Sequence, residues 1–328
     1  MDLKEMRVYL TRPIPEVGID MLRDTFPNFR MNEEDRVLDR NELLQAVQGV
    51  HGILSLLTDR IDAEVMDAAG SQLRVVANYA VGYDNIDLQA ATERNILVTN
   101  TPGVLTDATA DFAWALLMAT ARRIPESERF ARAGKYKAWG PKLFLGGDLI
   151  GRTLGIIGAG RIGTAVAKRS VGWNMRVLYT DVQRNEMLED AVQARFVDLD
   201  TLLRESDYIS IHVPLTSETH HLIDEAALRK MKPTAYLINT SRGPVIDEAA
   251  LARALKENVI AGAGLDVFEF EPKIHPELLE LDNVVITPHI ASATFDTRNK
   301  MATMAATNLI EALKGHRPPN LVNTEVWK

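Results

Sequence analysis

Residues 153–163, TLGIIGAGRIG, decide the fold, because they join an apolar run to glycines at positions 158, 160 and 163. The apolar run predicts a buried β-strand, and residues 164–169 are typical of the helix that follows it. Glycines at Gly158, Gly160 and Gly163 permit a tight turn, a close backbone approach to a pyrophosphate and close packing of helix on strand. The helix N-terminus adds free N–H groups and a positive dipole end. This stretch predicts a dinucleotide-binding βαβ unit.

The next predicted strand ends at an acidic residue, Asp181. A carboxylate there accepts hydrogen bonds from the adenosine ribose hydroxyls and repels a 2′-phosphate, which favours NAD over NADP. Arg184 could instead face a 2′-phosphate, although a solvated loop charge is the simpler interpretation. We therefore expect NAD as cofactor, with NADP possible. A glycine-rich turn that merely packs is the alternative, but the strand, the helix and Asp181 together argue against it.

Outward from this stretch, apolar runs alternate with helical patterns along the whole chain. Continuous apolarity in strands separated by helices is typical of parallel sheets covered on both faces. The pattern predicts an α/β fold with two Rossmann-like, doubly wound parallel-sheet domains. The strands are expected at 6–11, 49–57, 73–80 and 96–101 in the first unit, and at 153–158, 175–181, 194–199, 207–213, 235–240, 261–267 and 284–287 in the second.

Two predicted helices matter for the organisation of the chain. Residues 107–123 leave almost no polar face, so this helix is expected either inside a core or between subunits, with neither place favoured. The last helix, residues 298–314, could return to pack on the first unit.

The composition limits the function classes. The 328 residues include no cysteine, which excludes disulfides, thiolate nucleophiles and iron–sulfur ligation; we expect no metal and a reducing, cytoplasmic location. A formal charge of −8 argues against a nucleic-acid partner. No apolar stretch approaches the roughly 20 residues that cross a bilayer, and we see no secretory signal, so no membrane association is expected.

Three polar clusters follow predicted strands of the second unit, at 239–244, 265–272 and 287–292. Ligands bind open α/β sheets outside the carboxyl ends of their strands, so the clusters should converge. His289 suits a proton donor to a carbonyl oxygen near neutral pH. Glu271 would orient that imidazole and favour its protonated form. Arg242 offers a planar fork for a substrate carboxylate, which points to small 2-keto acids.

Each of these residues also has an ordinary structural interpretation. His289 could be a satisfied loop histidine, Glu271 a surface charge and Arg242 a structural ion-pair partner. Their shared placement after strands is what favours complementary catalytic roles.

Several motifs in order along the chain resemble the D-isomer-specific 2-hydroxyacid dehydrogenase family, in particular its glyoxylate/hydroxypyruvate reductase branch. The motifs are GAGRIG at 158–163, NTSRGPVID at 239–247, GLDVFEFEP at 264–272, TPHIASAT at 287–294 and NYAVGYDNID at 78–87. The resemblance covers nearly the whole chain and implies reduction of glyoxylate, and of hydroxypyruvate, to the 2-hydroxy acids glycolate and D-glycerate.

The resemblance also implies a domain organisation. A substrate-binding domain of residues 1–101 and 290–328 would surround a coenzyme domain of residues 102–289, with the active site in the cleft between them. It assigns substrate anchoring to Arg242 and acid/base catalysis to Glu271 and His289. Backbone N–H groups of Val81 and Gly82 would bind the substrate carboxylate, as in a nest-like anion site; a plain strand-to-helix turn is the alternative.

Further contacts are implied by the same resemblance. Leu57 and Trp139 would line the substrate pocket, with Trp139 reaching from a neighbouring subunit; ordinary packing is its alternative. A homodimer would form through the coenzyme domains. Cofactor contacts are expected from Thr106, Gly158, Gly160, Arg161, Ile162, Gly163, Asp181, Val213, Pro214, Thr219, Thr240, Asp266, His289 and Ala291.

Other functions stay open at this point. Another D-2-hydroxyacid dehydrogenase, or a phosphite or formate dehydrogenase, would share the fold and most of the motifs. A non-enzymatic, NAD-sensing scaffold similar to transcriptional corepressors would even keep Arg242, Glu271 and His289.

Overall fold

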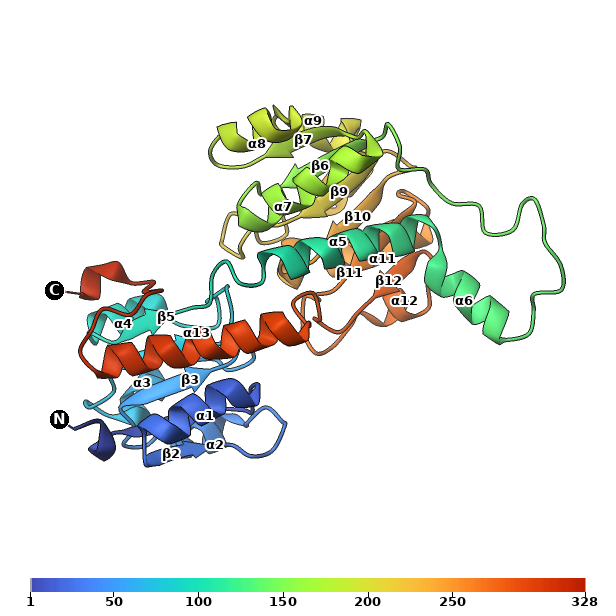
Figure 1. Cartoon of the computed structure of the whole chain (residues 1–328). Helices are drawn as coiled ribbons and strands as arrows, with labels where there is room; N and C mark the ends of the chain where they lie inside the picture. Colours follow the sequence, from blue (N-terminus) through green and yellow to red (C-terminus); the bar gives the residue numbers. More distant parts are fainter. Residues whose placement is uncertain (1, 328) are drawn as a thin grey trace. The chain divides into compact units, whose positions relative to one another are not determined.

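A computed structural model describes residues 2–327, which divide into two compact units. Unit 1 comprises Met1–Leu105 with Ala293–Lys328, and unit 2 comprises Thr106–Ser292. Each unit contains a parallel β-sheet with helices packed on it (Figure 1). The predicted fold class, α/β with two doubly wound parallel sheets, is confirmed. No helix between residues 2 and 327 is long and apolar enough to span a bilayer.

Unit 1 has a five-stranded sheet in the order β2-β1-β3-β4-β5. Helices α1 and α13 pack together on one face, while α2, α3 and α4 cover the other (Figure 1). Its elements are β1 (Arg7–Leu10), α1 (Glu16–Thr25), β2 (Asn28–Met31), α2 (Arg40–Ala46), β3 (Gly52–Ser55), α3 (Ala63–Ala69), β4 (Val75–Asn78), α4 (Leu88–Glu93), β5 (Leu97–Thr99) and α13 (Phe295–Leu313).

The sequence predicts four of these strands but not β2. Strand β2 pairs with β1 only and has a half-exposed pattern, so it lacks the continuous apolarity that marks the buried strands. The return of the last helix to unit 1 is confirmed: α13 packs on α1, β3 and β4.

Unit 2 has a seven-stranded sheet in the order β12-β11-β10-β9-β6-β7-β8, and all seven predicted strands are present. Its elements are α5 (Thr106–Ala121), α6 (Ile124–Arg132), β6 (Thr153–Ile157), α7 (Arg161–Arg169), β7 (Arg176–Thr180), α8 (Glu186–Val192), β8 (Arg195–Phe196), α9 (Leu199–Glu205), β9 (Tyr208–Ile211), α10 (Glu225–Lys230), β10 (Tyr236–Asn239), α11 (Glu248–Lys256), β11 (Gly262–Leu265), α12 (Pro276–Leu279) and β12 (Val284–Ile286).

The topology of unit 2 fixes where a ligand can bind. Strand order reverses between β6 and β9, and every adjacent pair in the sheet is parallel. All carboxyl ends therefore lie along one edge of the sheet. In an open α/β sheet, this edge at the reversal point is the ligand-binding edge.

The apolar helix α5 packs largely into the core of unit 2. It contacts α7, β10 and β11, and the Trp114 indole N–H donates to the Val166 carbonyl at 2.9 Å while its ring stacks on Trp173. Ala115 on the same helix is exposed. Burial within the unit thus accounts for most of the apolar surface of this helix.

Candidate functional site

The glycine turn connects β6 to α7 at the ligand-binding edge. Gly158 has a φ of +91°, which L side chains rarely adopt, and its N–H donates to the Thr180 carbonyl at 2.9 Å. A Cβ added to Gly163 would lie 2.0 Å from the Gly158 carbonyl oxygen. The first turn of α7 therefore lies directly against the glycine turn, and this contact requires a glycine at position 163.

The N-terminus of α7 fits an anionic group. The residue before this helix, Gly160, has no side chain to cap it. By contrast, the residues before α9, α10 and α11 are Asp198, Asp224 and Asp247, whose carboxylates accept a first-turn N–H. A Cβ added to Gly160 would meet no described protein atom within 4 Å. Uncapped N–H groups beside open space are what a pyrophosphate needs. Arg161 and Ile162 open the same helix.

Asp181 follows β7 and is bound to the glycine turn. One of its carboxylate oxygens accepts the Ala159 N–H at 2.7 Å, and the other accepts the Val182 N–H at 2.6 Å. Asn185 then donates its side-chain amide to the Ala159 carbonyl at 2.7 Å. Both backbone groups of Ala159 thus hold the segment after β7. A carboxylate has about four acceptor positions, so Asp181 retains capacity for ribose hydroxyls.

Further predicted cofactor residues follow β9 and β10. Val213 and Pro214 come directly after β9, and the Thr219 hydroxyl fixes their loop by donating to the Pro214 carbonyl at 2.6 Å. Thr240 follows β10, and its buried hydroxyl oxygen has no hydrogen-bond partner within residues 2–327. Buried polar atoms are rarely left unpaired, so this hydroxyl is a position where a ligand atom fits.

His289 and Glu271 lie together, as the sequence predicts. His289 Nδ1 and Glu271 Oε2 are 2.9 Å apart, and the two side chains are 27% and 30% exposed to solvent. Burial raises the pKa of Glu271, but the hydrogen bond and charge of His289, the Phe268 N–H and the charge of Arg242 outweigh it and hold the pKa below its ordinary value. Glu271 is therefore an ionised hydrogen-bond partner of the His289 imidazole.

The loop that carries His289 is bonded to Asp266, directly after β11. The Asp266 side chain is fully buried and accepts three hydrogen bonds, from the Thr287 hydroxyl at 2.7 Å and from the Ile290 and Ala291 N–H groups at 2.8 Å each. His289 itself has a φ of +54°, and its N–H donates to the Asp266 carbonyl at 2.8 Å. A left-handed residue held this firmly is typical of a functional position.

The segment that carries Glu271 is held by two other glutamates, which sequence reasoning missed. The buried Glu248 carboxylate accepts the N–H groups of Glu269 and His275 at 2.7 Å each. Glu269 in turn accepts the Glu248 N–H at 3.2 Å and contacts His221 Nε2 at 2.8 Å. Glu248 follows Asp247 at a helix start, where an acidic residue usually indicates only capping, so the pattern gave no signal for this role.

Arg242 lies in the segment after β10. Its guanidinium donates to the Ser241 carbonyl at 2.9 Å, and its charge lowers the pKa of Glu271. Arg242, Glu271 and His289 thus follow three adjacent strands, β10, β11 and β12. This is the convergence that the sequence predicts, although their catalytic roles stay predictions.

The remaining predicted residues lie elsewhere. Leu57, Val81 and Gly82 belong to unit 1, where the Asn100 and Asn78 side chains donate to the Val81 and Gly82 carbonyls at 2.7 and 2.9 Å. Thr106 begins α5, and Trp139 lies in the loop after α6 with 80% of its surface exposed. Their predicted roles are not tested by these contacts. Within residues 2–327, no group of three or more acidic or histidine side chains could hold a metal ion.

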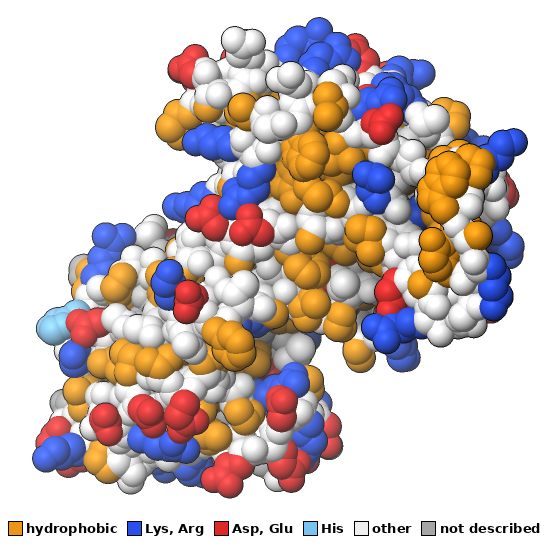
Figure 2. Space-filling view, turned by 45° about the vertical axis from the view of Figure 1, so that its right-hand side comes forward, with side chains coloured by type: hydrophobic (Ala, Val, Ile, Leu, Met, Phe, Trp, Pro, Cys, Tyr) orange, Lys and Arg blue, Asp and Glu red, His pale blue; other side chains and the backbone are white. Residues whose placement is uncertain are grey.

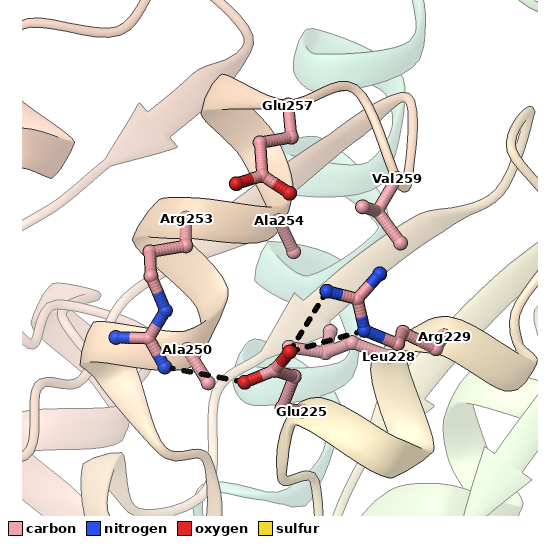
Figure 3. Close-up of a pocket in the computed structure, with 8 residues that line it drawn as sticks. All are labelled: Glu225, Leu228, Arg229, Ala250, Arg253, Ala254, Glu257 and Val259. Atoms are coloured by element: carbon pink, nitrogen blue, oxygen red, sulfur yellow. Dashed lines mark hydrogen bonds and ion pairs between the residues drawn. The ribbon is translucent and has the colours of Figure 1, made fainter.

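A pocket between α10 and α11 is not part of this site. Glu225 lies between two arginines there, 2.8 Å from Arg229 Nη2 and 3.5 Å from Arg253 Nη2 (Figure 3). Both arginines pair with Glu225, and none of the predicted site residues lines the pocket.

Comparison with known proteins gives the family. A sequence profile described as D-isomer specific 2-hydroxyacid dehydrogenase, NAD binding domain, matches residues 114–291. The chain is 55% identical over 326 residues to a glyoxylate reductase of Pyrococcus horikoshii, covering 98% of this chain and 97% of the relative.

Solved structures agree with this match. A protein from Thermus thermophilus superposes with a TM-score of 0.90 at 47% identity, covering 97% of this chain and all of the other. An NADPH-dependent glyoxylate/hydroxypyruvate reductase from Sinorhizobium meliloti, solved with NADP and malonate, gives 0.84 at 33% identity, covering 97% of each chain. The chain therefore belongs to the D-isomer specific 2-hydroxyacid dehydrogenase family.

Proposed function

We propose that the protein is an NAD(P)H-dependent glyoxylate reductase that also reduces hydroxypyruvate. The observation that carries this proposal is the His289–Glu271 pair, 2.9 Å apart, on the sheet edge that also holds the glycine turn. The relatives from Pyrococcus horikoshii and Sinorhizobium meliloti support the substrate class, because both are named for glyoxylate reduction.

The chemistry needs one hydride and one proton. A bound NADH would supply the hydride to the carbonyl carbon of the keto acid. His289 donates the proton to the carbonyl oxygen from Nε2, because Nδ1 is engaged with Glu271. Glu271 holds the imidazole in this orientation and stabilises its protonated form. Arg242 binds the substrate carboxylate and polarises the adjacent carbonyl. The backbone N–H groups of Val81 and Gly82 are proposed as further carboxylate ligands.

NAD is the preferred cofactor in this proposal. The Asp181 carboxylate supports that preference, because it would repel a 2′-phosphate. The residues proposed to hold the cofactor are those of the glycine turn and of the segments after β7, β9, β10, β11 and β12, with Thr106 at the start of α5. Unit 2 would then be the coenzyme domain and unit 1 the substrate-binding domain.

We also propose a homodimer formed through unit 2. Hydrophobic side chains gather on the visible face of this unit (Figure 2). In the loop after α6, Trp139, Leu145 and Ile150 are 80%, 66% and 71% exposed, and exposed apolar side chains that gather on one surface are typical of an interface. A monomeric mass measured by sedimentation equilibrium would overturn the proposed dimer.

The cytoplasmic location expected from the cysteine-free sequence stays a prediction. Cell fractionation, which measures the compartment that holds the protein, would test it.

His289→Ala tests the proposal. We expect glyoxylate reduction to fall by roughly 10²–10⁴-fold, as for loss of a general acid, while NADH binding persists. His316→Ala is the matched control, because His316 forms a similar pair with Glu311, 2.8 Å apart, at the end of α13. Turnover unchanged in His289→Ala would contradict the assignment.

A substrate screen tests the reaction itself. NADH oxidation by the wild-type protein is measured with glyoxylate, hydroxypyruvate, pyruvate and phenylpyruvate. Glyoxylate and hydroxypyruvate should be the best substrates. No oxidation with any of the four would overturn the proposed activity and favour a non-enzymatic NAD-sensing scaffold.

A further inference from the structure

The turn between β7 and α8, residues 181–185, carries a single cationic side chain, Arg184. Its guanidinium is engaged by Glu189 one turn into α8: Nη2 lies 2.7 Å from one carboxylate oxygen and Nε lies 3.2 Å from the other. This two-point contact satisfies the planar fork of arginine and neutralises its charge.

Glu189 is itself held in place by a tyrosine of the sheet. The hydroxyl of Tyr179, whose side chain is fully buried at the end of β7, donates to Glu189 at 2.5 Å and accepts the Asn185 N–H at 2.8 Å. The hydrogen bonds from Arg184 and Tyr179 lower the pKa of Glu189, so the carboxylate is charged at neutral pH. The Arg184 guanidinium also lies 5.9 Å above the ring of Phe196.

We propose that Glu189 is a positioning residue for cofactor choice: it holds Arg184 away from the adenosine 2′ position and thereby keeps the site selective for NADH over NADPH. The inference deepens the proposed function, since it rests on a dinucleotide binding beside Asp181. A 2′-phosphate adds negative charge next to the Asp181 carboxylate and needs a cation to compensate it. Arg184 is three residues from Asp181 on the same turn, but its charge is already matched by Glu189.

The test measures binding, not turnover. Dissociation constants for NADH and NADPH are obtained by fluorescence titration of the purified full-length protein, at low and high salt. Glu189→Gln should lower the ratio of the NADPH constant to the NADH constant by about two- to fivefold, the range expected when an exposed ion pair is released. The gain should shrink at high salt, because exposed charges are screened.

Two further variants separate this effect from a general loss of negative charge. Glu186→Gln removes an exposed glutamate at the start of the same helix and should leave the ratio at the wild-type value. Glu189→Gln combined with Arg184→Ala should return the ratio to the wild-type value. A ratio in Glu189→Gln equal to that in Glu186→Gln, or a gain that survives Arg184→Ala, overturns the proposal.

The wild-type measurements keep the two proposals distinguishable. Preference for NADPH in the wild type overturns this inference and the proposed NAD preference, because Arg184 would then be available to the phosphate, but it leaves the proposed reduction of keto acids untouched. Binding of NADH without reduction of any keto acid overturns the proposed activity and leaves the binding test valid. Failure to bind either dinucleotide overturns both.

Discussion

The side chains at the carboxyl edge of the unit 1 sheet bond to one another. The Thr11 hydroxyl donates to the buried Asp59 carboxylate at 2.5 Å, and the Asn78 and Asn85 side chains are 3.0 Å apart. Asn85 donates in turn to the carbonyls of Leu56 and Asp59 at 3.0 Å each. These side chains are therefore paired within the unit, whereas the buried hydroxyls of Thr99 and Thr101, at and just after the end of β5, have no partner within residues 2–327.

The corresponding edge of the unit 2 sheet retains capacity for a ligand. Its glycine turn leaves open space at Gly160, the Thr240 hydroxyl has no partner within the described chain, and His289 and Glu271 are partly exposed. Both edges thus hold a buried threonine hydroxyl without a partner in the described chain, and they differ in the glycine turn and the partly exposed His289–Glu271 pair of unit 2. Local residue chemistry, more than fold, decides which edge is a cofactor site.

Among the variants that test this difference between the two edges, Gly163→Ala should have the largest effect. The added Cβ would meet the Gly158 carbonyl and displace α7 from the glycine turn. Misplacement of about 1 Å can cost roughly 10²-fold in rate, so we expect kcat/KM for NADH to fall by about that factor. Steady-state kinetics check this, with Gly172→Ala as control, because a Cβ there meets no described atom within 4 Å. Equal kinetics in the two variants would contradict the packing argument.

Glu271→Gln should have a smaller effect, seen in the rate of glyoxylate reduction near neutral pH. The Glu271 carboxylate is ionised, because its pKa is held below the ordinary value, and it lies 2.9 Å from His289 Nδ1. Its replacement should loosen the orientation of the imidazole. A partly exposed pair contributes up to about 1 kcal/mol, so we expect reduction to slow by up to about fivefold. Steady-state kinetics measure this effect, which should be well below that of removing the general acid itself.

The matched control is Glu280→Gln, which removes an exposed glutamate from the same connection between β11 and β12. Its rate should equal that of the wild type. Equal rates in Glu271→Gln and Glu280→Gln would show that Glu271 does not act through His289.

Thr11→Val, at the edge of the unit 1 sheet, should lower the stability of the protein and leave cofactor binding unchanged. The change removes the hydroxyl that donates to buried Asp59, which should lower the free energy of unfolding by about 1–3 kcal/mol. NADH affinity should not change, because Thr11 lies in unit 1. Urea unfolding and NADH titration measure the two quantities. Thr58→Val, at an exposed neighbouring position, should stay within about 0.5 kcal/mol of wild type. A loss of NADH affinity in Thr11→Val would undermine the contrast between the edges.

Much of the fold was predictable because buried parallel strands are continuously apolar. The strands of unit 2 other than its exposed edge strand β8 were predicted for this reason, and so was the convergence of Arg242, Glu271 and His289 after neighbouring strands. The edge strand β2 was not, because its residues are half exposed. Helix α5 had two predicted places, since apolarity alone does not say whether a helix packs on its own sheet or on another subunit.

The residues that hold the site in place could not be predicted in the same way. Glu248 is only 5% exposed and binds two backbone N–H groups, but a glutamate at a helix start normally indicates a solvated charge. Asn185 caps α8 and also binds Ala159, 26 residues earlier. Such contacts depend on distances between segments far apart in sequence, which no local pattern contains.

The bonds from Asp266 to the His289 loop have a consequence for motion. Opening this loop would break three hydrogen bonds to a carboxylate and leave it unpaired in the interior, and each unpaired charged group costs several kcal/mol. We therefore expect the loop to open only rarely and together with the neighbouring part of the sheet. An exposed loop, in contrast, fluctuates fast and by itself. His289 lies in a loop, but this loop should be about as rigid as strand β11, because Asp266 directly follows that strand.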